Sequence, residues 1–159
     1  KFLKVRPSNR WLMLGYHVAL SNNQLWTAWH CCERRHQRET KLARSIDAEF
    51  MRYLAGTHHV SEAFSKAGLG NDNSKGWLVY LPEGEELIDQ SVNPQSDFRH
   101  LFDSQYNEII NTLNLEILDE TPKLNLDNAI KLGLDGENLN LENLEDSLIA
   151  FIISSEFNS

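Results

Sequence analysis

Two kinds of apolar pattern run along the chain, and each predicts a different element. Two short runs of apolar and aromatic residues end at turn-forming residues, which predicts strands at residues 11–20 and 77–81. The first run stops at a Ser-Asn-Asn sequence, and the second stops at Pro82, which has no N–H to donate to a strand ladder. We expect the first strand to be central or nearly central in its sheet.

Apolar residues spaced three and four apart predict helices through most of the remaining chain. Ser21, Asn22 or Asn23 is suited to cap the first helix, and Gly56 is suited to a left-handed cap after the second. Gly68 marks the end of the third helix, and residues 115–118 fit either a short strand or a helix end. The predicted helices span residues 24–39, 40–56, 58–67, 98–113, 126–133 and 141–157.

These elements define the expected fold class. A chain of 159 residues has the usual size of one domain with one hydrophobic core. The pattern contains more helix than strand, and its strands are few and short. We therefore predict a single, helix-rich α/β domain over residues 1–159, in which helices pack on a small mixed or antiparallel sheet.

The sequence also carries signals about the cellular compartment. No apolar run reaches the roughly 18–20 residues that cross a bilayer, and the N-terminal segment has no continuous apolar stretch typical of a signal peptide. The two cysteines, Cys31 and Cys32, are adjacent and cannot link distant segments. We expect a cytoplasmic protein that has no membrane partner.

Charge is divided unequally between the two parts of the chain. Residues 1–66 hold 11 Lys and Arg against 5 Asp and Glu, and residues 67–159 hold 4 against 18. The first part is therefore +6 and the second −14, which gives the net charge of −8. This division suggests that the first part faces a polyanion and the second a basic protein surface, whereas ordinary solvated helix faces are the simpler interpretation.

The chain lacks the common signatures of catalysis and metal binding. It contains no G-x-S-x-G elbow, no G-x-x-x-x-G-K-[ST] phosphate loop and no H-E-x-x-H zinc helix. His30 and His36 are six residues apart, which does not place two imidazoles on one face of a helix. We expect no metal, no cofactor, no small-molecule substrate and no enzymatic activity.

One enzymatic alternative remains, because Cys31 or Cys32 could be a nucleophile with His30 or His36 as its base. Cys32 falls on the apolar face of its predicted helix, which favours core packing over reactivity. An active thiol would have a lowered pKa and would alkylate rapidly near neutral pH.

The most suggestive chemical feature is a series of cations with nearby histidines. Guanidinium and ammonium groups can bind phosphates, and imidazoles near Trp26 and Trp29 can stack on unpaired bases. The simpler alternative is that Glu33, Glu39 and Asp47 neutralise part of the series. The candidate nucleic-acid-binding residues are Arg34, Arg35, Arg38, Lys41, Arg44, His58 and His59.

A set of ordered motifs overlaps this series. In chain order they are Leu25-Trp26-Thr27-Ala28, Lys41-Leu42-Ala43-Arg44, Glu49-Phe50-Met51-Arg52-Tyr53-Leu54-Ala55-Gly56 and Val60-Ser61-Glu62-Ala63-Phe64. The stretch resembles the kinase-binding subunit of the KEOPS complex, the TPRKB family, in its archaeal-type form. That family has serine where Ala55 stands and Arg-Gln-Ile where His58-His59-Val60 stands.

The resemblance implies a non-catalytic subunit of the machinery that makes threonylcarbamoyladenosine in tRNAs. Members of this family bind and stimulate the small atypical kinase/ATPase of the complex, and archaeal forms help capture tRNA through its unpaired 3′ CCA end. The expected partners are therefore this kinase and the single-stranded end of tRNA. An alternative keeps the kinase without direct RNA contact, and it uses an apolar stripe of residues 141–157 that could equally belong to the protein's own core.

Overall fold

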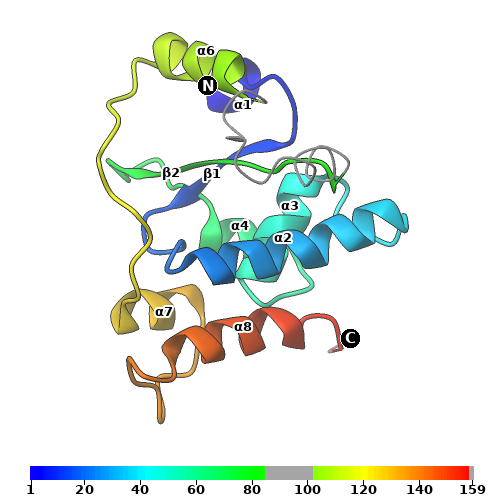
Figure 1. Ribbon diagram of the computed structural model, residues 1–159, viewed down its shortest axis with the longest axis vertical. Coiled ribbons are helices and arrows are strands. Elements are labelled where there is room, and N and C mark those ends of the chain that lie inside the picture. Colours follow the sequence, from blue (N-terminus) through cyan, green and yellow to red (C-terminus); the bar gives the residue numbers. More distant parts are fainter. Residues whose placement is uncertain (85–101, 158–159) are drawn as a thin grey trace, which may run out of the picture.

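The computed structural model describes residues 1–84 and 102–157. Its elements follow one another as a short helix, a strand, three helices, a second strand and three further helices (Figure 1). They are α1 (Phe2–Val5), β1 (Trp11–Gly15), α2 (Asn22–Gln37), α3 (Ile46–Leu54), α4 (Val60–Ala67), β2 (Gly76–Tyr80), α6 (Asp103–Leu113), α7 (Leu126–Leu132) and α8 (Leu144–Ser154).

The two strands form an antiparallel ribbon that is covered on both faces. Its register places Leu12 opposite Val79 and Leu14 opposite Trp77, and these four side chains join the hydrophobic core. Side chains alternate between the faces of a strand, so Trp11 points the other way. Its ring packs against Tyr80 and Phe102, and its Nε1 donates to Gln105 of α6 at 2.8 Å.

The helices are arranged in layers around this ribbon (Figure 1). Helices α1 and α6 lie on one side, and α2, α3 and α4 lie on the other. Helices α7 and α8 form a further layer, in which α8 packs on α2 and α3. Buried side chains of α8 complete the core, namely Leu144, Leu148 and Ile152.

The predicted fold class is confirmed, because helices pack on a small antiparallel sheet, but the first strand is shorter than expected. It ends at Gly15, and the turn that follows is closed by a hydrogen bond from Val18 N to Gly15 O at 3.1 Å. The apolar pattern continues to Leu20 because residues 18–20 are buried in the core outside the ladder. The expectation of a central strand is wrong for the described residues, where the sheet has two strands.

A buried glutamine fixes the start of α2. Ser21 is the N-cap, its hydroxyl accepts from Gln24 N at 3.0 Å, and the Gln24 side chain accepts from the Ser21 backbone. The Gln24 side chain also accepts from Leu20 N and donates to Val18 O. These bonds pair the backbone groups of a buried turn, and they anchor the helix that carries Arg34 and Arg35 in its last turn.

The second predicted helix begins six residues later than expected, at Ile46. Residues 38–45 instead turn the chain between α2 and α3, with Glu39 in the left-handed region at φ 56°. Glu49 stabilises this turn because its carboxylate accepts a hydrogen bond from Leu42 N at 2.7 Å. Several predicted cations therefore lie in a connection between helices.

Gly56 follows α3 at φ +62°, as its position in the sequence predicts. A Cβ at this residue would stand 2.5 Å from the ring of Phe151 in α8. We expect Gly56→Ala to lower the free energy of unfolding by about 1–2 kcal/mol from backbone strain alone, with a further cost from the displaced ring. Urea denaturation measures the change, and Gly70→Ala, in a loop without a positive φ, is the control that should stay within about 0.5 kcal/mol.

The other predicted boundaries hold closely. Helix α7 ends before Gly133, and α8 occupies the central part of its predicted range. The helix predicted over 98–113 includes α6, while its residues 98–101 lie outside the described part of the chain. Residues 115–118 form neither a strand nor a helix end.

The segment of residues 115–125 crosses the molecule without regular structure (Figure 1). It connects α6, at one end of the fold, to α7, near the other. Most of its residues are exposed, and Glu120 attaches it to the body of the protein. The Glu120 carboxylate accepts from the Tyr16 hydroxyl at 2.9 Å and pairs with Lys75 at 3.6 Å. Across residues 1–84 and 102–157, no helix has the length and apolar character needed to cross a membrane.

Candidate nucleic-acid interface

The predicted cations follow the C-terminal end of α2 and the turn after it. Arg34 and Arg35 lie in the last turn of the helix, and Arg38 is its C-cap. Positive side chains are favourable there because the helix dipole places negative charge at its C-terminal end. Lys41 and Arg44 lie further along the connection to α3. The local structure therefore gathers these five residues at the C-terminal end of α2 and in the turn after it, which we call the basic end.

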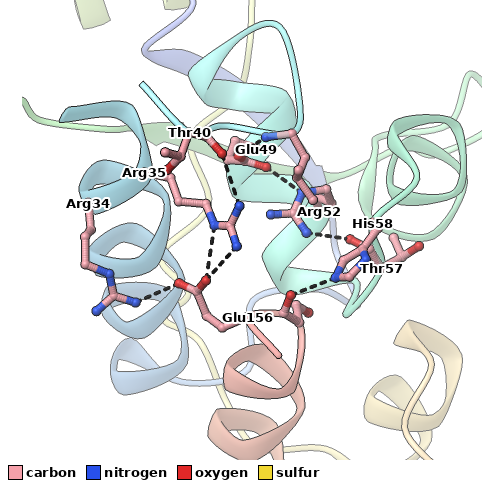
Figure 2. Close-up of polar contacts among 10 residues, drawn as sticks. Arg34, Arg35, Thr40, Glu49, Arg52, Thr57, His58 and Glu156 are labelled. Carbon is pink, nitrogen blue, oxygen red and sulfur yellow. Dashed lines mark hydrogen bonds and ion pairs between the residues drawn. The ribbon is translucent and has the colours of Figure 1, made fainter. Parts of the chain in front are cut away.

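Two of the cations bind a single carboxylate from the far end of the sequence (Figure 2). Arg34 Nη2 donates to Glu156 Oε1 at 2.6 Å. Arg35 donates to Glu156 Oε2 through Nε at 3.1 Å and through Nη2 at 2.9 Å. Arg35 also donates to Thr40 O at 3.1 Å, which ties it to the turn after α2. Glu156 is thus held by three N–H donors from adjacent residues.

Glu156 was not among the predicted site residues. It follows the C-cap of α8, where the helix dipole disfavours a negative charge. Burial alone would raise the pKa of its carboxyl, but the hydrogen bonds from Arg34 and Arg35 lower the pKa below its ordinary value. The carboxylate is therefore ionised near neutral pH and depends on the arginines for its place.

A tyrosine lies beneath this ion pair. Tyr53 is fully buried, and its hydroxyl lies beside the Glu156 carboxylate at a contact that falls short of standard hydrogen-bond geometry. Burial and the nearby Glu156 carboxylate together raise the pKa of Tyr53. The phenol is therefore a neutral donor that is directed at the place where Glu156 sits.

The two candidate histidines have different environments. His58 is partly buried, and its Nε2 lies 2.8 Å from Ser155 O, so this nitrogen carries the proton (Figure 2). His59 is exposed and is the N-cap residue of α4, with its backbone N donating to Thr57 Oγ1 at 3.1 Å. His58 therefore joins the group formed by Arg34 and Arg35, because it binds Ser155 while the two arginines bind the next residue, Glu156.

The remaining three cations do not pair with Glu156. Arg38 and Arg44 are exposed, and neither makes a side-chain hydrogen bond or ion pair with any residue in the described ranges. Lys41 Nζ lies 2.9 Å from His36 Nδ1. Burial and the Lys41 charge both lower the pKa of His36, which keeps that imidazole neutral. Arg38 and Arg44 are available to an external anion, and the half-buried Lys41 lies between them in the sequence.

Two of the carboxylates expected to neutralise the series do not contact it. Glu33 is buried and pairs with Arg10 at 2.7 Å, and Asp47 pairs with Arg6, also at 2.7 Å. Both arginines precede β1, a part of the chain that the helical pattern did not connect with α2. Arg6 and Arg10 of the N-terminal segment thus neutralise these two carboxylates. The alternative that Glu33 and Asp47 neutralise the cation series is therefore wrong.

A fully buried ion pair supports the surface from inside. Arg52 Nε donates to Glu49 at 2.5 Å, and both side chains have no exposed area. Arg52 Nη1 also donates to Thr57 O at 3.0 Å, and Glu49 accepts from Leu42 N (Figure 2). This pair therefore joins the turn before α3 to the turn after it, and these turns carry Lys41 and His58.

The aromatic residues expected to stack on bases differ in exposure. Trp29 is buried, and its Nε1 donates to Pro82 O at 2.8 Å, so it belongs to the fold. Trp26 is 43% exposed, and its ring lies 6.4 Å from that of the exposed His30. Trp26, His30 and Arg34 follow one another at intervals of four, so they lie on one side of α2, and Arg38 follows as its C-cap.

The environment of the cysteines bears on the thiol alternative. Both are buried and free, and burial raises the pKa of Cys31 and of Cys32. A raised pKa leaves little thiolate at neutral pH, so neither residue has the character of an activated nucleophile. Within residues 1–84 and 102–157, no three His, Cys, Asp or Glu side chains are grouped in a way that could hold a metal ion.

The fold and this surface define a helix-rich α/β domain with an exposed basic end, which is partly closed by its own C-terminal segment. No family model, no curated protein and no solved structure matches the chain.

Proposed function

We propose that this protein is a non-catalytic subunit of KEOPS type, which binds the small atypical kinase/ATPase and helps recruit tRNA through its 3′ CCA end. The motifs of residues 25–68 supply the resemblance, and they form one structural unit of α2, α3 and α4. The cytoplasm, where tRNA is modified, is the proposed compartment.

One observation carries the RNA-binding part of this proposal. The neighbouring carboxylates Glu33 and Asp47 are paired with arginines of the N-terminal segment, which leaves the cations after α2 unneutralised by them. Arg38, Lys41 and Arg44 then offer three positive charges to phosphates, and Trp26, toward the other end of α2, offers an exposed ring on which a base can stack.

We expect Arg38→Ala combined with Lys41→Ala to weaken tRNA binding and to reduce its salt dependence. Each lost contact with a single-stranded phosphate lowers the slope of log K against log salt by about 0.7. Fluorescence anisotropy with labelled tRNA, titrated at several salt concentrations, measures both quantities. Trimming the 3′ CCA from the same tRNA should weaken binding to the unchanged protein.

The matched control is Lys4→Ala combined with Lys131→Ala. It removes the same formal charge from two exposed positions, in α1 and α7, outside the basic end. A change of equal size in both double variants would mean that RNA responds to net charge alone. An unchanged affinity and slope after Arg38→Ala with Lys41→Ala would contradict the assigned surface.

A second candidate function is a protein-only adaptor of the kinase. The observation that favours it is the end of α8, where Ile153 is 41% exposed and Phe157 is 81% exposed. Large apolar side chains in such positions are typical of contacts with another protein. Binding of the kinase without any affinity for intact tRNA would favour this candidate.

A further inference from the structure

We propose that Arg34, Arg35 and the Tyr53 hydroxyl form a phosphate-binding site, and that Glu156 occupies it in place of a phosphate of the bound nucleic acid. The C-terminal segment then regulates the basic surface by competing with its ligand. This inference rests on the proposed function, because it assigns the phosphate to nucleic acid.

The geometry at Glu156 is that of an occupied anion site. Arginine forks bind carboxylates and phosphates with the same arrangement of parallel N–H donors. Here the guanidinium groups of Arg34 and Arg35 converge on both oxygens of one carboxylate, at 2.6, 2.9 and 3.1 Å. A phosphate of a nucleic-acid chain has two non-bridging oxygens, as a carboxylate has, and also two ester oxygens that accept hydrogen bonds more weakly, so it can use a further donor.

The Tyr53 hydroxyl provides that donor. It is buried, its proton is retained, and it lacks a hydrogen bond of standard geometry in the described chain. Buried polar groups rarely stay unpaired, so such a hydroxyl beside an ion pair needs an explanation. An ester oxygen of a phosphate bound in the place of Glu156 would give this hydroxyl a further acceptor, beside the marginal contact that it makes with the Glu156 carboxylate.

Glu156 is held in a way that allows it to leave. It lies beyond the last helical residue of α8, at the end where the helix dipole opposes its charge. The Arg34 side chain is 49% exposed, so its pair with Glu156 is weakened by water on the arginine side, while the Glu156 side chain itself is 14% exposed.

A larger movement, of the backbone at residues 155–157, would also affect His58. Its Nε2 donates to Ser155 O, the residue before Glu156. Displacement of residues 155–157 would therefore release Arg34, Arg35 and His58 together. Three candidate residues from two separate segments are thus controlled by one short piece of chain.

We expect Glu156→Ala to raise the affinity for labelled tRNA by about fivefold, because the binding-competent state no longer has to displace an internal ligand. The salt dependence should become steeper, by up to about 0.7 for each newly available contact. In the unchanged protein, Arg34 and Arg35 are already paired with Glu156, so a phosphate that replaces this carboxylate releases no counterions from them. Glu156→Gln, which preserves the shape of the side chain, should show the same trend and serves if the alanine variant is poorly folded.

Two control variants separate this mechanism from a change in net charge. Glu142→Ala removes an exposed carboxylate that precedes α8, away from the arginines. Equal gains from Glu142→Ala and Glu156→Ala would overturn the proposal, as would no gain from either Glu156 variant. Adding Arg34→Ala and Arg35→Ala to Glu156→Ala should abolish the gain, and a gain that persists would also overturn it.

A phosphate titration tests the site independently of RNA. The Nε–Hε NMR signals of Arg34 and Arg35 should shift with inorganic phosphate in Glu156→Ala, and they should shift less in the unchanged protein. If tRNA does not bind but these signals shift, the proposed function fails and the anion site stands. If tRNA binds through Arg38 and Lys41 while the signals stay fixed in both proteins, the anion site fails and the function stands.

Discussion

Replacing Arg52 with methionine is expected to lower the free energy of unfolding by about 3–5 kcal/mol, the cost of leaving a buried charge without its partner. The Glu49 and Arg52 side chains have no exposed area and lie 2.5 Å apart. Removing Arg52 leaves the Glu49 carboxylate in the interior and takes a donor from Thr57 O. Urea denaturation measures the loss, which is a large part of the stability of an ordinary domain.

Arg44→Met is the control for this substitution. Arg44 is exposed, so the same chemical change should alter stability by no more than about 0.5 kcal/mol. Replacing both partners, Glu49→Leu with Arg52→Met, should recover part of the loss, because no unpaired buried charge remains. A loss below about 1 kcal/mol for Arg52→Met would show that the pair does not support the two turns.

The substitution Leu148→Asp is expected to unfold the protein or to lower its stability by about 4 kcal/mol or more. Leu148 has no exposed area and belongs to the core cluster together with Leu144 and Ile152. An aspartate there removes packed carbons and introduces a charge without a partner. Circular dichroism during thermal unfolding would detect the loss of structure.

Ile153→Asp on the same helix is the matched comparison. Ile153 is 41% exposed, so an aspartate there can stay hydrated, and we expect little change in stability. A folded Ile153→Asp protein that no longer binds the kinase would place the partner at the end of α8. If Leu148→Asp stays folded at full stability, the core assignment of this stripe is wrong.

The sequence was sufficient for those parts of the fold that depend on nearby residues. The cap at Ser21, the left-handed Gly56 and the end of α7 each follow from the preferences of a few adjacent positions. The cations after α2 were also visible, because they are contiguous. The length of β1 was not, since burial of residues 18–20 imitates the pattern of a strand.

The partners of the charged residues could not be derived in this way. Arg10 and Glu33 are 23 positions apart, and Arg35 and Glu156 are 121 apart, so no helical spacing relates them. Only packing of the N-terminal segment and of α8 against α2 brings them together. One local signal was present for Glu156, a carboxylate at the end of a predicted helix where its charge is unfavourable without a cation.

The exposed segment of residues 115–125, which crosses the molecule, is a place where the chain can be cut into two fragments. Its exposed backbone is open to a protease, while the pieces on either side are joined by the common core. A single cut there would leave α7 and α8 attached through Leu144, Leu148 and Ile152 and through the Glu156 ion pairs. The last part of the protein could then be supplied as a separate peptide, and the two fragments would reassemble into one fold.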